Sequence, residues 1–354
     1  MRALTLRAGP DACALLQERG LRPEDVDIVP GASGGPKWLA IAGLDRFLFR
    51  EFFTAPRTRP LHLIGSSIGS WRMAALAQRD PLAALDRGHH AYIHGQRYTA
   101  RPDTAEVTRV LDAVLDALLG AHGVDDILAH PYARLHVITA QSRALANSLS
   151  RRRLGAALAL SATLNAVSRR GLSLSFRRVV FSNAGDESPL RDLHDLPTTH
   201  IALTAGNLRA ALAASGSIPL VINGLRIDSA PGGLHWDGGV IDYHLDLPFG
   251  PGDGLILYPH FYSHVVPGWF DKALRWRRAP VANFRRALLL APSDEFVARL
   301  PNGRIPDRRD FAAMSETARI RAWETVRSAS TQLGDELGDL IARGQIMKYV
   351  TPWV

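Results

Sequence analysis

Short apolar runs alternate along the chain with longer stretches in which apolar residues recur every three or four positions. The short runs predict buried strands, and the longer stretches predict helices that bury a face. Their regular succession indicates an α/β layer architecture. The helix expected at Leu154–Val167 is nearly all apolar, which suits it to burial. We expect strands at Asp27–Pro30, Leu61–Ile64, Leu135–Thr139, Val179–Phe181 and Gly254–Tyr258, and helices at Lys37–Arg50, Thr104–Leu119, Leu154–Val167 and Leu208–Ala214.

The pattern changes after about Val265, where tryptophan and arginine crowd together and the remaining residues look mostly helical. Within this part, Phe311–Ile346 predicts one or two amphipathic helices. The chain has no internal repeat and no low-complexity linker. We therefore expect a first domain in residues 1–265 and a mostly helical C-terminal extension in residues 266–354, packed on that domain or capping it.

Composition favours a globular protein. The 354 residues are 46% hydrophobic and 21% charged, enough for a large core and unlike a disordered chain. No apolar run is long enough to span a bilayer, and Asp11 interrupts the N-terminal segment before a signal-peptide core could form. Cys13 is the only cysteine, which excludes an intrachain disulfide and a cysteine-rich metal site. We expect a soluble, cytoplasmic protein.

The formal net charge of +8 allows an anionic partner. The chain has no zinc-finger spacing, no aromatic and basic pattern for single strands, and no clear helix-turn-helix, so we expect no nucleic-acid binding. Anionic lipid and ordinary solubility both remain open as reasons for the charge.

A first chemical signal is the sequence Gly-Ser-Ser-Ile-Gly at residues 65–69, between a predicted strand and a helical pattern. A serine at a sharp strand-to-helix corner projects its hydroxyl outward, and glycines two residues before and after it remove side chains that would collide. The N-terminal amides of the following helix would face an oxyanion formed above the serine. Ser67 is therefore a candidate nucleophile, and a plain tight turn is the alternative.

Two further segments carry chemistry. Val29–Leu44 places several glycines between a strand and a helix, which frees backbone amides for an anion. It lacks the Gly-Lys-Ser/Thr ending of a phosphate-binding loop, because Lys37 follows a proline and precedes a tryptophan. In the second segment two glycines follow Asp237, a carboxylate able to take a proton directly from a serine hydroxyl. A flexible turn and a surface Asp-Gly turn are the respective alternatives.

Together these segments resemble the patatin-like phospholipase family. Its motifs occur here in the family's order over about residues 25–260: Ser33-Gly34-Gly35-Pro36-Lys37, then Gly65-Ser66-Ser67-Ile68-Gly69, then Ala214-Ser215-Gly216-Ser217-Ile218-Pro219, then Asp237-Gly238-Gly239. The resemblance implies a three-layer α/β/α fold with a mostly parallel sheet and a Ser-Asp dyad without a catalytic histidine. It also implies that no organic cofactor is needed.

Carried over by position, the resemblance implies that Ser67 is the nucleophile and Asp237 its general base. The amides of Gly34 and Gly35 would receive the oxyanion, and Lys37 would lend charge or anchor the loop. The remaining motif glycines are Gly65, Gly69, Gly238 and Gly239.

The loop departs from the family pattern at three positions. Ser33 and Trp38 stand where the family usually has glycine, and Pro36 has no N–H to donate. These departures bear on which amides form the oxyanion hole.

A Ser-His-Asp triad is the alternative to the Ser-Asp dyad, since His235 and His244 flank the Asp237 motif. The glycine loop with its lysine fits the dyad better. Three histidines at 89, 90 and 94 invite a metal site, but no further ligand stands at a convincing spacing, and the same holds for His260 and His264. We expect no metal.

The helices predicted at Leu154–Val167 and Leu208–Ala214 are rich in alanine and leucine, so we expect them to line an apolar pocket for an acyl chain. With the resemblance, they favour an esterase or phospholipase A acting on acyl lipids. Acyl transfer to an acceptor other than water is a close variant. A catalytically weak or inactive homologue that binds lipid or protein is the alternative. A peripheral contact with an anionic membrane is expected through Trp269, Phe270, Lys272, Arg275 and Trp276, with a core-packing helix as the competing interpretation.

Overall fold

The centre of the fold is one mixed β-sheet. The computed structural model describes residues 2–250, 252–274, 276–277 and 279–353. Within them the strands follow the spatial order β10-β1-β9-β8-β2-β3-β4-β5-β6, with β7 paired to β4. The strands from β9 to β4 in this order are parallel, whereas β1, β5 and β7 run antiparallel to their partners β9, β4 and β4. The strands are β1 Leu4–Ala8, β2 Val26–Gly31, β3 Leu61–Ser66, β4 Ala133–Ser142, β5 Phe176–Ser182, β6 Thr198–Ala202, β7 His235–Asp237, β8 Leu255–Pro259, β9 Ala287–Pro292 and β10 Val350–Pro352.

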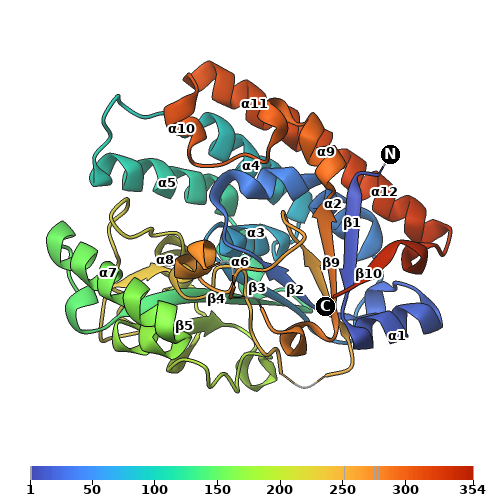
Figure 1. The fold of residues 1–354 in the computed structure, drawn as a ribbon, viewed down its shortest axis with the longest axis horizontal. Helices are drawn as coiled ribbons and strands as arrows, with labels where there is room; N and C mark the ends of the chain where they lie inside the picture. The colour runs from blue at the N-terminus through green and yellow to red at the C-terminus, as the bar shows by residue number, and fades with distance from the viewer. Residues whose placement is uncertain (1, 251, 275, 278, 354) are drawn as a thin grey trace.

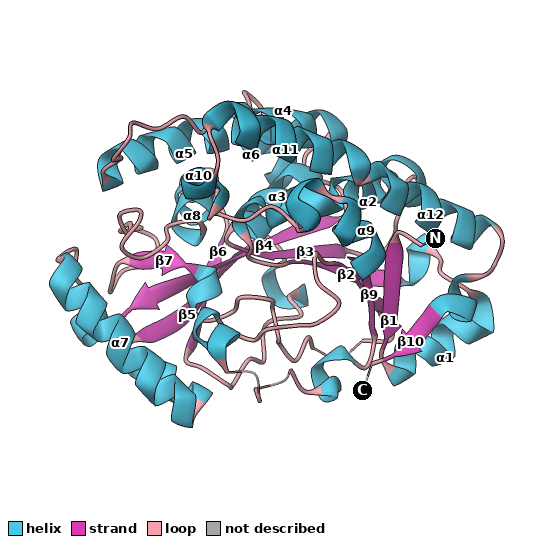
Figure 2. Cartoon of the chain, turned by 45° about the horizontal axis from the view of Figure 1, so that its top comes forward, coloured by secondary structure: helices cyan, strands magenta, loops and turns pink. Residues whose placement is uncertain are grey.

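Helices cover both faces of this sheet, which makes a three-layer α/β/α fold as predicted (Figure 1). Figure 2 shows α3, α4, α11 and α12 above the sheet, with α1, α7 and long loops below it. The helices are α1 Pro10–Arg19, α2 Ala42–Phe47, α3 Ile68–Leu76, α4 Pro81–His94, α5 Thr104–Leu119, α6 Gly123–Leu128, α7 Arg151–Val167, α8 Leu208–Ser215, α9 Asp294–Arg299, α10 Asp310–Ala313, α11 Glu316–Ala329 and α12 Thr331–Ala342.

The predicted strands are all present, and the helix predicted at Thr104–Leu119 has the bounds of α5. The single helix predicted at Lys37–Arg50 is instead a 3-10 helix at Gly35–Ile41, followed by α2 and a π turn at Leu48–Phe52. These conformations place apolar residues at similar spacings, so periodicity alone does not separate them.

Helix α7 is buried on one face only, contrary to the prediction. Leu154 and Leu158 pack inward, but Leu160 is 47% exposed and Val167 is 86% exposed. Apolar composition therefore overstated how much of this helix the fold covers.

The C-terminal part contributes to the sheet as well as to the helices. Phe311–Ile346 does hold amphipathic helices, α11 and α12. However, β9 lies between β8 and β1, and β10 pairs with β1. The sheet thus continues across the boundary predicted at residue 265. None of the helices in the described residues is long and apolar enough to cross a bilayer.

Candidate active site

Ser67 occupies a sharp corner between β3 and α3. Strand β3 ends at Ser66 and α3 begins at Ile68, and Ser67 itself has φ +56° and ψ −133°. A non-glycine residue rarely adopts this conformation, which stores strain. A Cβ at Gly65 would lie 2.3 Å from the Ser70 Cα, and one at Gly69 would lie 1.9 Å from the Gly31 carbonyl oxygen. Both glycines are therefore required by the close packing of this corner.

Asp237 reaches Ser67 because β7 pairs with β4, which places Asp237 opposite Thr139. The Ser67 hydroxyl donates a hydrogen bond of 2.6 Å to Asp237 Oδ2. The other carboxylate oxygen accepts from the Gly239 amide at 2.7 Å. Both side chains are buried. The two residues predicted to work together, 170 positions apart, thus meet directly.

The last residue of α8 and the loop after it hold the two residues in place. The Ser215 hydroxyl accepts from the Ser67 amide at 2.9 Å and donates to the Ile138 carbonyl oxygen at 2.7 Å. The Asp237 amide donates to the Ser217 carbonyl oxygen at 2.8 Å. The sequence marked this segment through the resemblance, but only the structure shows what it contacts.

Glycines after Asp237 allow equally close approaches. A Cβ at Gly238 would lie 2.2 Å from the Ile138 carbonyl oxygen, and one at Gly239 would lie 2.5 Å from Ser33 Oγ. The Ser33 hydroxyl in turn lies 3.1 Å from both the Ser66 carbonyl oxygen and the Ser66 hydroxyl. Ser33, a departure from the family pattern, thus connects the glycine-rich loop to the serine corner.

The glycine-rich loop lies beside Ser67. Gly35 has φ +58° and lines the same cavity as Ser67. Among the described residues, the amides of Gly34 and Gly35 donate to no protein acceptor. The Lys37 ammonium forms an ion pair with Asp307 and lies 3.5 Å from the Gly34 carbonyl oxygen. Of its two expected roles, this placement favours anchoring the loop.

Trp38, the second departure, belongs to the core. It is 2% exposed, and its ring packs against His89 and Tyr92 with centroid distances of 4.4 and 5.5 Å. In the part of the chain that the structure describes, Trp38 lines neither of the two cavities next to Ser67.

Two cations, Arg308 and Lys272, lie near the Asp237 carboxylate. Burial raises the pKa of Asp237, while the Ser67 hydroxyl, Arg308, the Gly239 amide and Lys272 act to lower it. Burial, helped by nearby Arg308 and Lys37, lowers the pKa of Lys272 to about 8. Arg308 lines both cavities next to Ser67. Arg308 lies within a basic segment and belongs to no motif, so the sequence gives no signal for its place at the site.

Ser67 opens on two cavities. The larger has a volume of about 290 Å³, close to the lower end for ligand pockets, and its lining is mostly apolar. A smaller one of about 60 Å³ is lined by Asp237 and by Leu158 of α7. We expected α7 and α8 to line an acyl pocket. Instead, the larger cavity takes its walls mainly from α3, α5 and the loop after α8, among them Trp71, Leu111, Ile218 and Val221. Phe311 of α10 also lines it.

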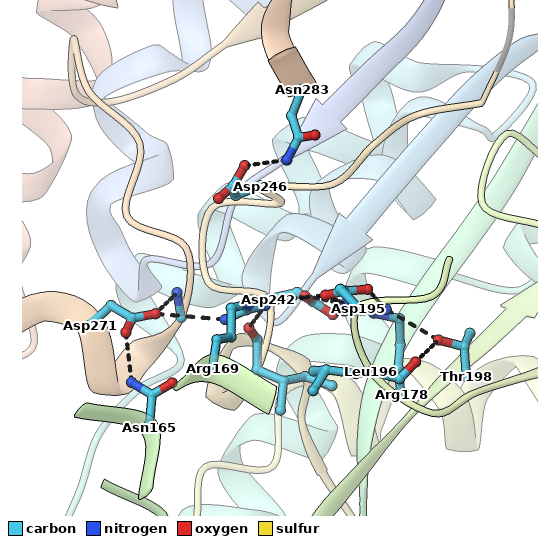
Figure 3. A network of polar contacts seen from close by, with 12 residues as sticks. Asn165, Arg169, Arg178, Asp195, Leu196, Thr198, Asp242, Asp246, Asp271 and Asn283 are labelled. Carbon is cyan, nitrogen blue, oxygen red and sulfur yellow. Dashed lines mark hydrogen bonds and ion pairs between the residues drawn. The ribbon is translucent and has the colours of Figure 1, made fainter. Parts of the chain in front are cut away.

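An ion-pair network holds the segment that follows Asp237 (Figure 3). Arg178 of β5 donates to both Asp242 oxygens at 2.7 and 2.8 Å and to Asp195 at 2.7 and 2.8 Å. Arg169 contacts Asp242 at 2.9 Å, and Asp271 accepts from Asn165 of α7 at 2.6 Å. The network therefore connects the sheet, the Asp237 segment and α7.

His235 and His244, which flank the Asp237 motif in the sequence, make contacts with other residues. His235 contacts the Thr139 hydroxyl at 2.9 Å, and His244 accepts from the Val266 amide at 3.0 Å. Within the described residues, neither histidine hydrogen bonds to Ser67 or Asp237. His94 instead lies 3.0 Å from Glu324. The described residues contain no group of three or more His, Cys, Asp or Glu side chains placed to hold a metal ion.

Comparisons with known proteins add little to this picture. No protein-family model and no curated protein matches the chain. Among solved structures, VipD from Legionella pneumophila is similar, with a TM-score of 0.38 and 12% identity, over 95% of this chain and 70% of VipD. A likeness this distant carries no functional argument, so the chemistry rests on the residues of this chain.

Proposed function

We propose that this protein is a serine hydrolase that cleaves carboxylic esters of acyl lipids, of the esterase or phospholipase A type. The observation that carries the proposal is the 2.6 Å hydrogen bond from the Ser67 hydroxyl to the Asp237 carboxylate, made at a strained strand-to-helix corner that opens on an apolar cavity. The motif resemblance to patatin-like phospholipases points the same way.

The chemistry proceeds in two halves. Asp237 takes the proton of Ser67 as the Ser67 oxygen attacks the ester carbonyl, and the resulting oxyanion accepts hydrogen bonds from the Gly34 and Gly35 amides. The intermediate collapses, and the leaving alcohol takes the proton from Asp237. Asp237 then deprotonates a water that attacks the acyl-Ser67 ester, and the released serine oxygen recovers the proton. No histidine is needed in this scheme.

The substrate class follows from the larger cavity. Its lining of Trp71, Leu111, Ile218 and other apolar residues favours an acyl chain over a polar group. Arg308 at the cavity wall offers a cation to the polar part of the same ester.

Hydrolysis of p-nitrophenyl esters of increasing acyl length tests the proposal. Ser67→Ala and Asp237→Asn are expected to lower kcat/KM by on the order of a thousandfold or more, because each removes a group that acts on the reacting atoms. Ser168→Ala and Asp253→Asn, both at exposed positions, are the matched controls and should retain activity. Activity that survives in folded Ser67→Ala would refute the proposal.

A non-catalytic lipid-binding homologue is the second candidate. It is favoured by Pro36, which removes one amide from the glycine-rich loop, and by Ser33 at a usual glycine position. An active-site phosphonate separates the two candidates, since a working oxyanion hole allows Ser67 to be labelled. A folded wild type that resists labelling would favour the binding protein.

A further inference from the structure

The large apolar side chains that the described residues leave exposed are concentrated around one helix. Two of them, Leu160 and Val167, belong to α7. The others belong to short segments on either side of α7 in the chain, to the loop after α8 and to the segment near residue 270: Leu145, Leu149, Leu174, Val221, Trp269 and Trp276.

These segments pack on α7. The 3-10 helices at Ala144–Ala146, Arg169–Leu174 and Trp269–Ala273 all contact it. Arg151 donates to the Leu220 carbonyl oxygen at 2.8 Å, which holds the loop after α8 against the start of α7. We call this region, α7 with the exposed residues named above, the α7 surface.

The exposed side of α7 is a stripe with helical spacing. Arg153, Ala156, Leu160, Thr163 and Val167 recur every three or four residues and are all exposed. The opposite side, including Leu154 and Leu158, packs into a small hydrophobic cluster. Apart from Arg153 at its start and Thr163, the stripe is therefore an apolar face that the chain itself does not cover.

The segment of chain that contains α7 carries charge of one sign. The sequence from Arg143 to Gly185 contains no aspartate or glutamate. Three consecutive arginines, Arg151, Arg152 and Arg153, begin α7 and are exposed. Apolar side chains set among arginines suit the boundary between anionic headgroups and acyl chains.

The α7 surface is also continuous with the candidate site. Leu158, Leu220 and Trp269 line the smaller cavity together with Ser67 and Asp237. A lipid surface lying on α7 would therefore place acyl lipid at the opening of the site.

We propose that the α7 surface binds the protein to an anionic lipid bilayer, with the apolar stripe in the interface and the arginines on the headgroups. This revises the contact expected from the sequence. Trp269 is 45% exposed and Trp276 is 71% exposed, so both belong to it, whereas Phe270 packs inward against the cluster under α7. Arg275 lies outside the described residues. Binding does not require hydrolysis, so the inference goes beyond the proposed function.

Vesicle flotation tests the inference with phosphatidylcholine alone and with phosphatidylcholine mixed with phosphatidylglycerol. The wild type should float with the mixed vesicles, and added salt should weaken that binding. Reversing Arg151, Arg152 and Arg153 to glutamate should lower the partition coefficient by on the order of a hundredfold or more. Leu160→Gln with Val167→Gln should lower it by on the order of tenfold without changing the net charge.

The matched control reverses three exposed arginines that belong to α9 and α11 or directly follow α12, helices that lie away from α7 in both ribbon views: Arg299→Glu, Arg321→Glu and Arg343→Glu. It has the same net charge as the first variant and should still bind. Equal loss in both triple variants would overturn the inference, since it would show that only net charge matters. So would binding that is unchanged in the α7 variants.

Three further results distinguish membrane binding by the α7 surface from the proposed hydrolase function and from dimerisation. A wild type that hydrolyses soluble esters but never floats overturns the α7 proposal and leaves the hydrolase intact. A wild type that floats with the vesicles but hydrolyses no ester overturns the hydrolase proposal and leaves the α7 proposal intact. Concentration-dependent dimerisation that Leu160→Gln abolishes, measured by sedimentation without vesicles, would assign the surface to a second copy of this chain and overturn the proposal.

Discussion

At the scale of single residues, the candidate site depends on the protonation of one buried carboxyl group. Asp237 can accept the Ser67 proton only while it is ionised, and burial raises its pKa above the usual aspartate range. Activity should therefore fall as the pH is lowered through that raised pKa. Arg308 opposes the shift, because its positive charge favours the carboxylate.

Replacing Arg308 by glutamine should move the acid limb of the kcat/KM profile to higher pH, because the carboxylate loses a stabilising cation. Arg308→Lys keeps the charge and should leave the limb near its wild-type position. The measurement is the pH dependence of kcat/KM on a soluble, uncharged ester for the three proteins. An acid limb that stays in place in Arg308→Gln would show that this arginine does not act on Asp237.

At the scale of elements, the close packing of α3 against β2 holds the serine corner. Gly69→Ala would put a Cβ 1.9 Å from the Gly31 carbonyl oxygen, a backbone atom of a central strand. We expect the free energy of unfolding to fall by about 3 kcal/mol or more. Gly155→Ala is the control, since nothing lies within 4 Å of its Cβ and alanine favours the α7 helix by roughly 0.5–1 kcal/mol. Urea unfolding of both variants checks this, and similar values for the two would contradict it.

The ion-pair network around Arg178 is a second stabilising feature at this scale. Arg178 and Asp242 are both fully buried, so removing the arginine leaves a buried carboxylate without its main partner. Arg178→Ala should lower the free energy of unfolding by about 3–5 kcal/mol. Arg177→Ala, at the half-buried neighbouring position, is the matched control and should cost less than about 1 kcal/mol. Equal losses in the two variants would show that the network does not stabilise the Asp237 segment.

At the scale of the whole molecule, the C-terminal part belongs to the same folding unit as the site. Strand β9 supplies the contact between β8 and β1, and α12 packs on α2, where a Cβ at Gly43 would lie 2.0 Å from the Ser330 carbonyl oxygen. Asp307 and Arg308 reach the site from the same part of the chain. The C-terminal part therefore completes both the sheet and the site.

A fragment of residues 1–265 should therefore fail to fold. It would lack β9, so β8 and β1 would lose their shared neighbour and expose unpaired backbone groups. Circular dichroism and thermal unfolding of the fragment and the full chain provide the measurement. A fragment that unfolds cooperatively would instead support an independent domain ending near residue 265.

Sequence alone predicted the α/β class, the main strands and the candidate serine and aspartate, because these depend on local periodicity and on short motifs in a fixed order. It did not predict β9 as a member of the sheet, since the neighbours of that strand lie far away in the chain. The same limit applies to Arg308 and to the exposed side of α7, which only packing identifies. Local patterns thus determined which elements form, whereas contacts between distant segments decided that Ser67 meets Asp237, which cations stand beside them and which apolar face is left uncovered.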